Sequence, residues 1–151
     1  MMRRPLLAAG LLAAACNAPL AWAQAAQDAP KAPACPADAA ALPVQALYGS
    51  WEARIDGQDG IATVVLEKHP EYDGVRGSIR RAGQPPAQLA GDIDPEGQLA
   101  LDESQDGKSI SASWSGALQS GSCGKEFKGT WRRSSDDSSH AFVLHKAASW
   151  K

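Results

Sequence analysis

The chain has 151 residues and carries 15 Lys and Arg side chains against 17 Asp and Glu, a formal net charge of −2. That length fits a single domain. The charges form no block of one sign, which argues against nucleic-acid binding because neutralising phosphates requires clustered Lys and Arg.

Residues 1–23 have the pattern of a signal peptide. Arg3 and Arg4 form a charged start, an Ala- and Leu-rich run follows, and Ala-Trp-Ala at 21–23 supplies the small-x-small ending that signal peptidase requires. The apolar run is too short for a membrane span. We therefore predict a periplasmic or secreted protein with no integral membrane segment after cleavage.

A lipobox is the alternative at the same end of the chain. Leu12-Ala-Ala-Ala-Cys16 loosely resembles one, and a lipidated Cys16 would anchor the protein to a membrane. A lipobox usually has a branched aliphatic residue three positions before its cysteine, where this chain has Ala13. We therefore prefer the Ala-Trp-Ala site.

Residues 24–46 are predicted to be an Ala- and Pro-rich flexible leader. Between Gln24 and Pro43 the only large aliphatic residue is Leu42, so burial cannot offset the entropy of ordering. A short helical turn around Ala37–Leu42 is the one structure that we consider there.

Two cysteines remain after cleavage, Cys35 and Cys123. In an oxidising compartment they are expected to form a disulfide that ties the leader to a late loop; two free buried thiols are the alternative. The chain has no Cys-x-x-Cys motif, so oxidoreductase chemistry has no support.

Residues 47–151 are predicted to form an all-β domain, because apolar and polar residues alternate there and turn residues recur about every eight to twelve positions. Short links permit antiparallel neighbours and exclude helical crossovers. The predicted strands are Leu47–Ile55, Ile61–Lys68, Val75–Arg81, Ala87–Asp94, Gln98–Glu103, Ser109–Leu118, Glu126–Arg133 and His140–His145.

A large-x-Gly-x-large pattern recurs in these strands, centred on Gly49, Gly77, Gly91, Gly116 and Gly129. Glycine lets a sheet bend sharply. We therefore predict a small eight-stranded antiparallel up-and-down (meander) β-barrel, with a two-sheet sandwich as the alternative.

The predicted interior is apolar. It holds Trp51, Trp114, Trp131, Phe127, Ile79, Ile93, Leu99, Leu101 and Leu118. We expect no Asp, Glu, His or Cys on that face, so we predict no catalytic residue and no enzyme. His69, His140 and His145 have no ligand-like spacing and are expected on the exposed rim, so neither a metal nor a cofactor is predicted.

The aromatic residues allow two interpretations. They could fill the core of a small barrel, or Trp51, Trp114, Trp131 and Phe127 could line a cup for an apolar or aromatic small ligand.

The stretch DIDPEGQLALDE, residues 92–103, has the outline of an EF-hand calcium loop. Alternating segments flank it, however, whereas an EF-hand requires helices. Asp94-Pro-Glu-Gly97 is typical of a tight turn, so we predict a hairpin between two strands.

Two places resemble the lipocalin and avidin group of barrels. Gly49-Ser50-Trp51 is similar to the Gly-x-Trp of their first strand, and Ser113-Trp114-Ser115-Gly116 followed by Gly129-Thr130-Trp131 is similar to late avidin strands. The resemblance implies the barrel architecture. The biotin contacts do not carry over, because Ile110, Ala112 and Ala53 replace the polar residues.

The sequence thus predicts a non-catalytic binding or envelope-accessory protein whose partner is an apolar small molecule or an envelope protein. The alternative is an inhibitor acting through its leader. Periplasmic inhibitors of secreted metalloproteases are similar in design, with eight-stranded barrels, one disulfide and an N-terminal segment that enters the protease cleft.

Overall fold

The computed structural model describes residues 34–36 and 38–148. Two short 3-10 helices, η1 (Ala39–Ala41) and η2 (Val44–Leu47), precede eight strands: β1 (Gly49–Ile55), β2 (Ala62–Lys68), β3 (Val75–Arg80), β4 (Ala87–Ile93), β5 (Gln98–Ser104), β6 (Ala112–Leu118), β7 (Glu126–Arg133) and β8 (Ser139–Lys146). The predicted signal peptide, the Cys16 lipobox and residues 24–33 of the leader lie outside the described residues.

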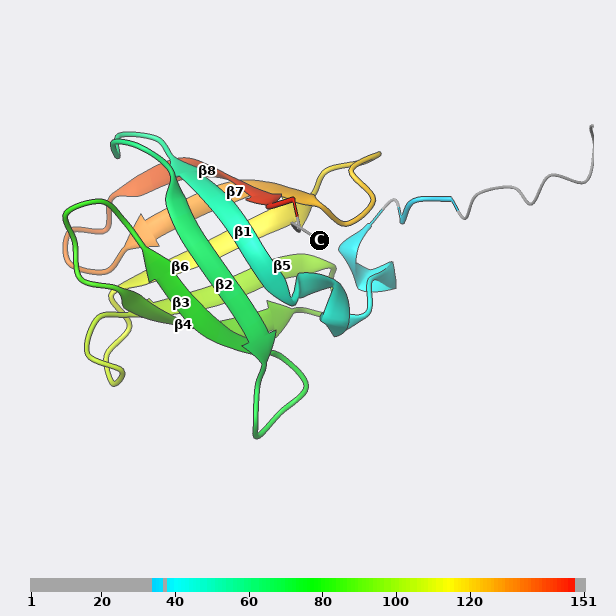
Figure 1. The fold of residues 1–151 in the computed structure, drawn as a ribbon, viewed down its shortest axis with the longest axis horizontal. Coiled ribbons are helices and arrows are strands. Elements are labelled where there is room, and N and C mark those ends of the chain that lie inside the picture. The colour runs from blue at the N-terminus through cyan, green and yellow to red at the C-terminus, as the bar shows by residue number, and fades with distance from the viewer. Residues whose placement is uncertain (1–33, 37, 149–151) are drawn as a thin grey trace, which may run out of the picture. The chain divides into compact units, whose positions relative to one another are not determined.

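The strands form a closed barrel in chain order (Figure 1). Each strand is antiparallel to the next, and β8 closes the barrel on β1 through pairs such as Ala53 with Leu144. The predicted up-and-down barrel is therefore confirmed, and a two-sheet sandwich is excluded. This architecture is compatible with the lipocalin and avidin resemblance.

The glycines on the inner face are required by close contacts between strands. A Cβ atom on Gly77 would lie 1.8 Å from the carbonyl oxygen of Val65, and one on Gly129 would lie 2.0 Å from that of Ser115. No side chain fits at these distances, so glycine permits the bends that close the barrel.

The first and sixth strands begin later than predicted. Leu47 belongs to η2, where its carbonyl oxygen accepts a hydrogen bond from Trp51 Nε1 at 2.8 Å. β6 starts at Ala112 instead of Ser109 because Asp106 Oδ1 accepts hydrogen bonds from the backbone N–H groups of Lys108 and Ser109 and holds them in a turn.

One end of the barrel, which we call the closed end, is covered by η1 and η2 (Figure 1). Ala39 and Leu47 are buried there. Lys146, on β8, donates to the carbonyl oxygens of Ala46 and Tyr48 and lies 4.9 Å from the centre of the Trp51 ring. Burial lowers the pKa of Lys146. The final part of the segment predicted as a leader is thus folded onto the barrel.

The predicted disulfide is present between Cys35 and Cys123, whose Cα atoms are 4.5 Å apart. It joins the segment before η1 to the loop between β6 and β7. Asp38 supports the same region by accepting a hydrogen bond from the Ala40 N–H at the start of η1.

The stretch 92–103 forms the predicted hairpin between β4 and β5. The Gly97 N–H donates to the Asp94 carbonyl at 2.9 Å, and Gly97 has a φ of 80°. Asp94 Oδ1 also accepts from the Gln98 N–H. Strands flank the turn on both sides, so the EF-hand outline does not correspond to a helix–loop–helix fold.

No helix within residues 34–36 and 38–148 is both long enough and apolar enough to span a membrane.

Candidate ligand site at the open end of the barrel

A carboxylate lies inside the barrel, which corrects the prediction of a wholly apolar interior. Glu103, on β5, is 2% exposed and shares the inner face with Leu99 and Leu101. The strict alternation of the strand requires this placement, because residues 99, 101 and 103 point to the same side. Asp102, which points outwards, is the exposed acid of this pair.

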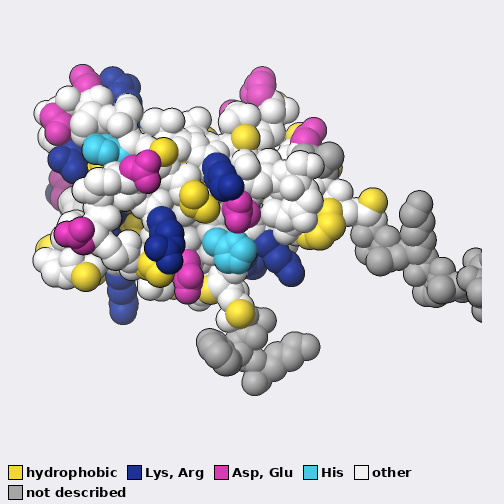
Figure 2. Space-filling model, turned by 90° about the horizontal axis from the view of Figure 1, so that it is seen from above, with side chains coloured by type: hydrophobic (Ala, Val, Ile, Leu, Met, Phe, Trp, Pro, Cys, Tyr) yellow, Lys and Arg dark blue, Asp and Glu magenta, His cyan; other side chains and the backbone are white. Residues whose placement is uncertain are grey.

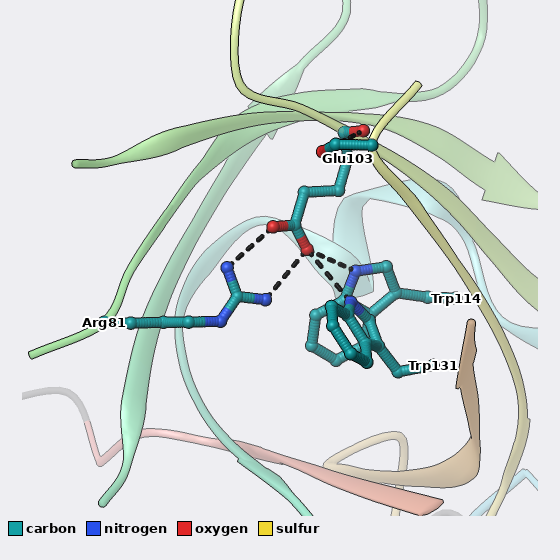
Figure 3. A network of polar contacts seen from close by, with 5 residues as sticks. Arg81, Glu103, Trp114 and Trp131 are labelled. Atoms are coloured by element: carbon teal, nitrogen blue, oxygen red, sulfur yellow. Dashed lines mark hydrogen bonds and ion pairs between the residues drawn. The ribbon is translucent and has the colours of Figure 1, made fainter. Parts of the chain in front are cut away.

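Glu103 forms a bidentate ion pair with Arg81, which follows β3 (Figure 3). Arg81 Nη1 donates to Oε1 at 2.6 Å and Arg81 Nη2 donates to Oε2 at 2.8 Å. Their side chains are 8% and 2% exposed, so solvent screens this pair poorly. The paired fork geometry is the strongest arrangement available to these two groups.

Two indole N–H groups also donate hydrogen bonds to the same carboxylate. Trp114 Nε1 on β6 donates to Glu103 Oε2 at 3.2 Å, and Trp131 Nε1 on β7 donates to it at 3.1 Å. Figure 3 shows both rings approaching the carboxylate from the side opposite Arg81. We call these four residues, Arg81, Glu103, Trp114 and Trp131, the Glu103 cluster.

The cluster offsets the cost of burying a charge by supplying donors from three other segments of the barrel. Among the described residues, Arg81 Nε is buried without a hydrogen-bond partner. A second guanidinium, that of Arg133, lies 5.3 Å from the centre of the Trp131 ring, and that of Arg81 lies 5.6 Å from it. Cations this close to an indole are attracted to its electron-rich face.

A cavity of about 760 Å³ lies above the Glu103 cluster. Its walls come from the loops joining β1 to β2, β3 to β4, β5 to β6 and β7 to β8, which meet at what we call the open end. The lining residues are Gly57, Gln58, Asp59, Arg81, Ala82, Gln84, Glu103, Gln105, Ile110, Ser111, Ala112, Trp131, Arg133, Ser134 and Ser135. This volume lies within the range of small-molecule sites.

The four aromatic residues predicted to line a cup are divided between the two ends. Trp51 and Phe127 lie at the closed end with ring centres 5.9 Å apart, and both are fully buried. Trp114 packs against Phe142 and donates to Glu103 beneath the cavity. Trp131 lines the cavity itself. Whether these residues bind a ligand remains a prediction.

Arg81 and Glu103 were missed as site residues. Each lies two positions beyond a buried aliphatic residue at the end of a strand, Ile79 and Leu101 respectively. Arg81 and Glu103 have opposite charges, and each continues the inward alternation of its strand. This combination was the signal that could have identified the pair.

A second cavity of about 670 Å³ lies on the outer surface of β2 to β5. Its lining includes Val65, Glu67, Arg76 and Gln88, which are exposed residues of the outer face. Two of these already pair, since Arg76 Nε donates to Glu67 at 2.9 Å. This groove therefore lacks the sheltered groups that the open end provides.

The histidines are spread over the surface and one end of the barrel. His145 is exposed and lies 3.5 Å from Glu126, His140 is half-buried and packs on Trp131, and His69 stacks on Tyr72. Within the described residues no group of three or more His, Cys, Asp or Glu side chains is arranged to hold a metal ion.

Neither the protein-family models nor the curated proteins contain a match to this chain.

Proposed function

We propose that this barrel is a non-catalytic binding protein and that the open-end cavity is its site for a small molecule. The observation that carries the proposal is the combination of a large cavity with a buried ion pair and an indole at its base. A few fixed polar groups within a sheltered concave site are typical of small-molecule recognition.

An interior without ionisable groups cannot be the reason for an absence of catalysis, because Glu103 lies inside the barrel. The Glu103 cluster supplies a different reason. Both carboxylate oxygens of Glu103 already accept hydrogen bonds from charged or indole donors. A general base needs a free oxygen within reach of the proton it removes. Glu103 is therefore better suited to fixing the base of a site than to moving a proton.

The ligand was predicted to be apolar or aromatic. The closed half of the barrel supports no deep apolar chamber, because Trp51, Phe127 and Leu144 fill it at 0–1% exposure. Ligand contacts are instead available near Trp131 and the loops of the open end. We therefore propose a ligand bound at the barrel mouth. A place in the cell envelope and kinship with the lipocalin and avidin group remain proposals, supported by the predicted signal peptide and by Gly49-Ser50-Trp51.

Binding can be tested by native mass spectrometry of the purified protein against a panel of apolar dyes, aromatic acids, amino acids and small sugars. We expect at least one class to bind. A bulky substitution in the cavity wall, Ala82→Trp, should abolish binding because it fills the site. Ala141→Trp, on the exposed outer face of β8, is the matched control and should bind normally.

Two results would contradict the proposal: no binding by any class, or binding that survives Ala82→Trp. The alternative function, inhibition of a secreted protease by the leader, depends on residues 24–33, which lie outside the described residues. It therefore stays a prediction.

A further inference from the structure

We infer that the open-end cavity recognises an uncharged, polyhydroxylated small molecule of the size of a mono- or disaccharide. This inference rests on the proposed function and specifies its ligand class. It follows from three properties of the cavity: its balanced charges, its side-chain amides and hydroxyls, and its apolar surfaces.

The formal charges that line the cavity cancel. Asp59 and Glu103 are acidic, and Arg81 and Arg133 are basic. Three of these four are also engaged: Arg81 with Glu103 at 2.6 Å, and Arg133 with Asp136 at 3.4 Å. Asp59 is the one of the four without an ion pair among the described residues, and it is exposed, so water screens its attraction for a cation. An anionic ligand would give up its hydration to meet two arginines that already pair with carboxylates. The site therefore favours a neutral ligand.

The polar lining consists largely of groups that both donate and accept hydrogen bonds. Three glutamines, Gln58, Gln84 and Gln105, reach the cavity from three different loops, and Ser134 and Ser135 come from a fourth. A ligand hydroxyl likewise donates and accepts, so amides and hydroxyls satisfy it from several directions. An apolar ligand would instead bury these groups without partners, which is unfavourable.

Apolar surface on the cavity wall comes mainly from Ile110, on the β5–β6 loop, which is 53% exposed. Trp131 also lines the base, but it is 4% exposed and lies beside Arg81 and Arg133, so only a small part of its ring faces the cavity. A sugar has C–H faces that pack against apolar side chains, while its hydroxyls form hydrogen bonds with polar ones. On the side of the molecule that Figure 2 presents, acidic and basic side chains are also interspersed.

The test uses heteronuclear NMR titrations of the mature protein with glucose, N-acetylglucosamine, maltose and trehalose, each at millimolar concentrations. Benzoate, arginine and a fatty acid are the comparison probes. We expect shifts confined to the four open-end loops with at least one sugar. Gln84→Ala and Gln105→Ala should each weaken binding about three- to tenfold, because each removes one ligand hydrogen bond. Gln88→Ala, on the outer face of β4, should leave the affinity unchanged.

The outcomes separate the ligand class from the proposed function. Binding of a comparison probe in the cavity, without binding of any sugar, would overturn the sugar inference and leave the binding function intact. Absence of shifts with every probe would contradict both. Sugar binding that is equally sensitive to Gln88→Ala and Gln84→Ala would place the sugar outside the cavity and overturn the inference.

Discussion

At the scale of single residues, Glu103 connects distant parts of the chain through one carboxylate. Its partners lie on or beside β3, β6 and β7, and the Arg81 and Glu103 side chains are almost completely buried. A buried ion pair contributes less to the free energy of unfolding than its short distances suggest, because both charges lose their hydration on folding. Removing one partner, however, leaves the other charge buried without compensation.

Glu103→Gln should therefore lower the free energy of unfolding by about 3–5 kcal/mol, since it leaves the Arg81 guanidinium unpaired. The double variant Arg81→Met with Glu103→Gln should cost less than the sum of the single variants, because each single variant leaves one buried charge unpaired and the double variant leaves none. Urea unfolding monitored by tryptophan fluorescence measures each value.

Glu67→Gln is the matched control, because Glu67 forms an exposed pair with Arg76. It should cost at most about 1 kcal/mol. Equal losses for Glu67→Gln and Glu103→Gln would contradict a special role for burial.

The cluster was only partly predictable. The period-two pattern placed Trp114 and Trp131 inside, which the structure confirms. The same pattern places Glu103 inside, although no acid was expected on that face. The partner of Glu103 could not be identified from one sequence, because Arg81 is 22 residues away and the contact depends on how the sheet curves.

At the scale of elements, the β5–β6 loop shows how one side chain sets a turn. Asp106 Oδ1 accepts hydrogen bonds from the backbone N–H groups of Lys108 and Ser109 and from Ser104 Oγ. These donors favour the ionised carboxylate and lower the pKa of Asp106 from 3.8 to about 2. This loop also carries Gln105 and Ile110 into the open-end cavity.

The pH dependence follows from the direction of that shift. Because the folded-state pKa is lower than the unfolded-state pKa, the charged group stabilises the protein above about pH 4, and this contribution is lost as pH falls through about 2. Asp106→Asn should therefore be less stable than the wild type at pH 6, and the difference should shrink between pH 4 and pH 2.

Urea unfolding at a series of pH values measures this difference. Asp106→Ala should be less stable than Asp106→Asn across the range, because it also lacks the acceptor oxygen. A wild-type advantage over Asp106→Asn that is the same at pH 6 and pH 2 would contradict ionisation as its source.

The strands themselves were largely predictable, because alternation and turn residues are local signals. The error at the start of β6 comes from the local Asp106 turn, whereas the error at the start of β1 is at an end that a distant group controls. η2 replaces the predicted start of β1 where Lys146, 100 residues beyond Ala46, donates to its backbone. No local pattern contains that contact.

At the scale of the whole barrel, the Cys35–Cys123 bridge encloses 88 positions of sequence. It fastens the segment before η1 to a loop at the same end. A loop of this length restricts the unfolded chain strongly in the entropy model, by about 4–5 kcal/mol.

Replacing both cysteines with serine should therefore lower the free energy of unfolding by about that amount, measured by urea unfolding of the oxidised wild type and the double variant. Chemical reduction of the wild type should produce the same loss. An unchanged urea midpoint in both cases would show that the bridge adds nothing beyond the packing of η1 and η2.

The closure of β8 on β1 also limits how this protein can bind other proteins. Each of the strands in the described part of the chain has neighbours on both sides, so none of them presents an unsatisfied edge. An open edge is the usual template on which a foreign strand adds or aggregation begins. A protein partner must therefore engage loops, side chains or the N-terminal segment. Strand-mediated self-association would first require two neighbouring strands to separate. The β1–β8 seam is the pairing in this barrel that no connecting hairpin reinforces, so its strength bears directly on whether an edge becomes exposed.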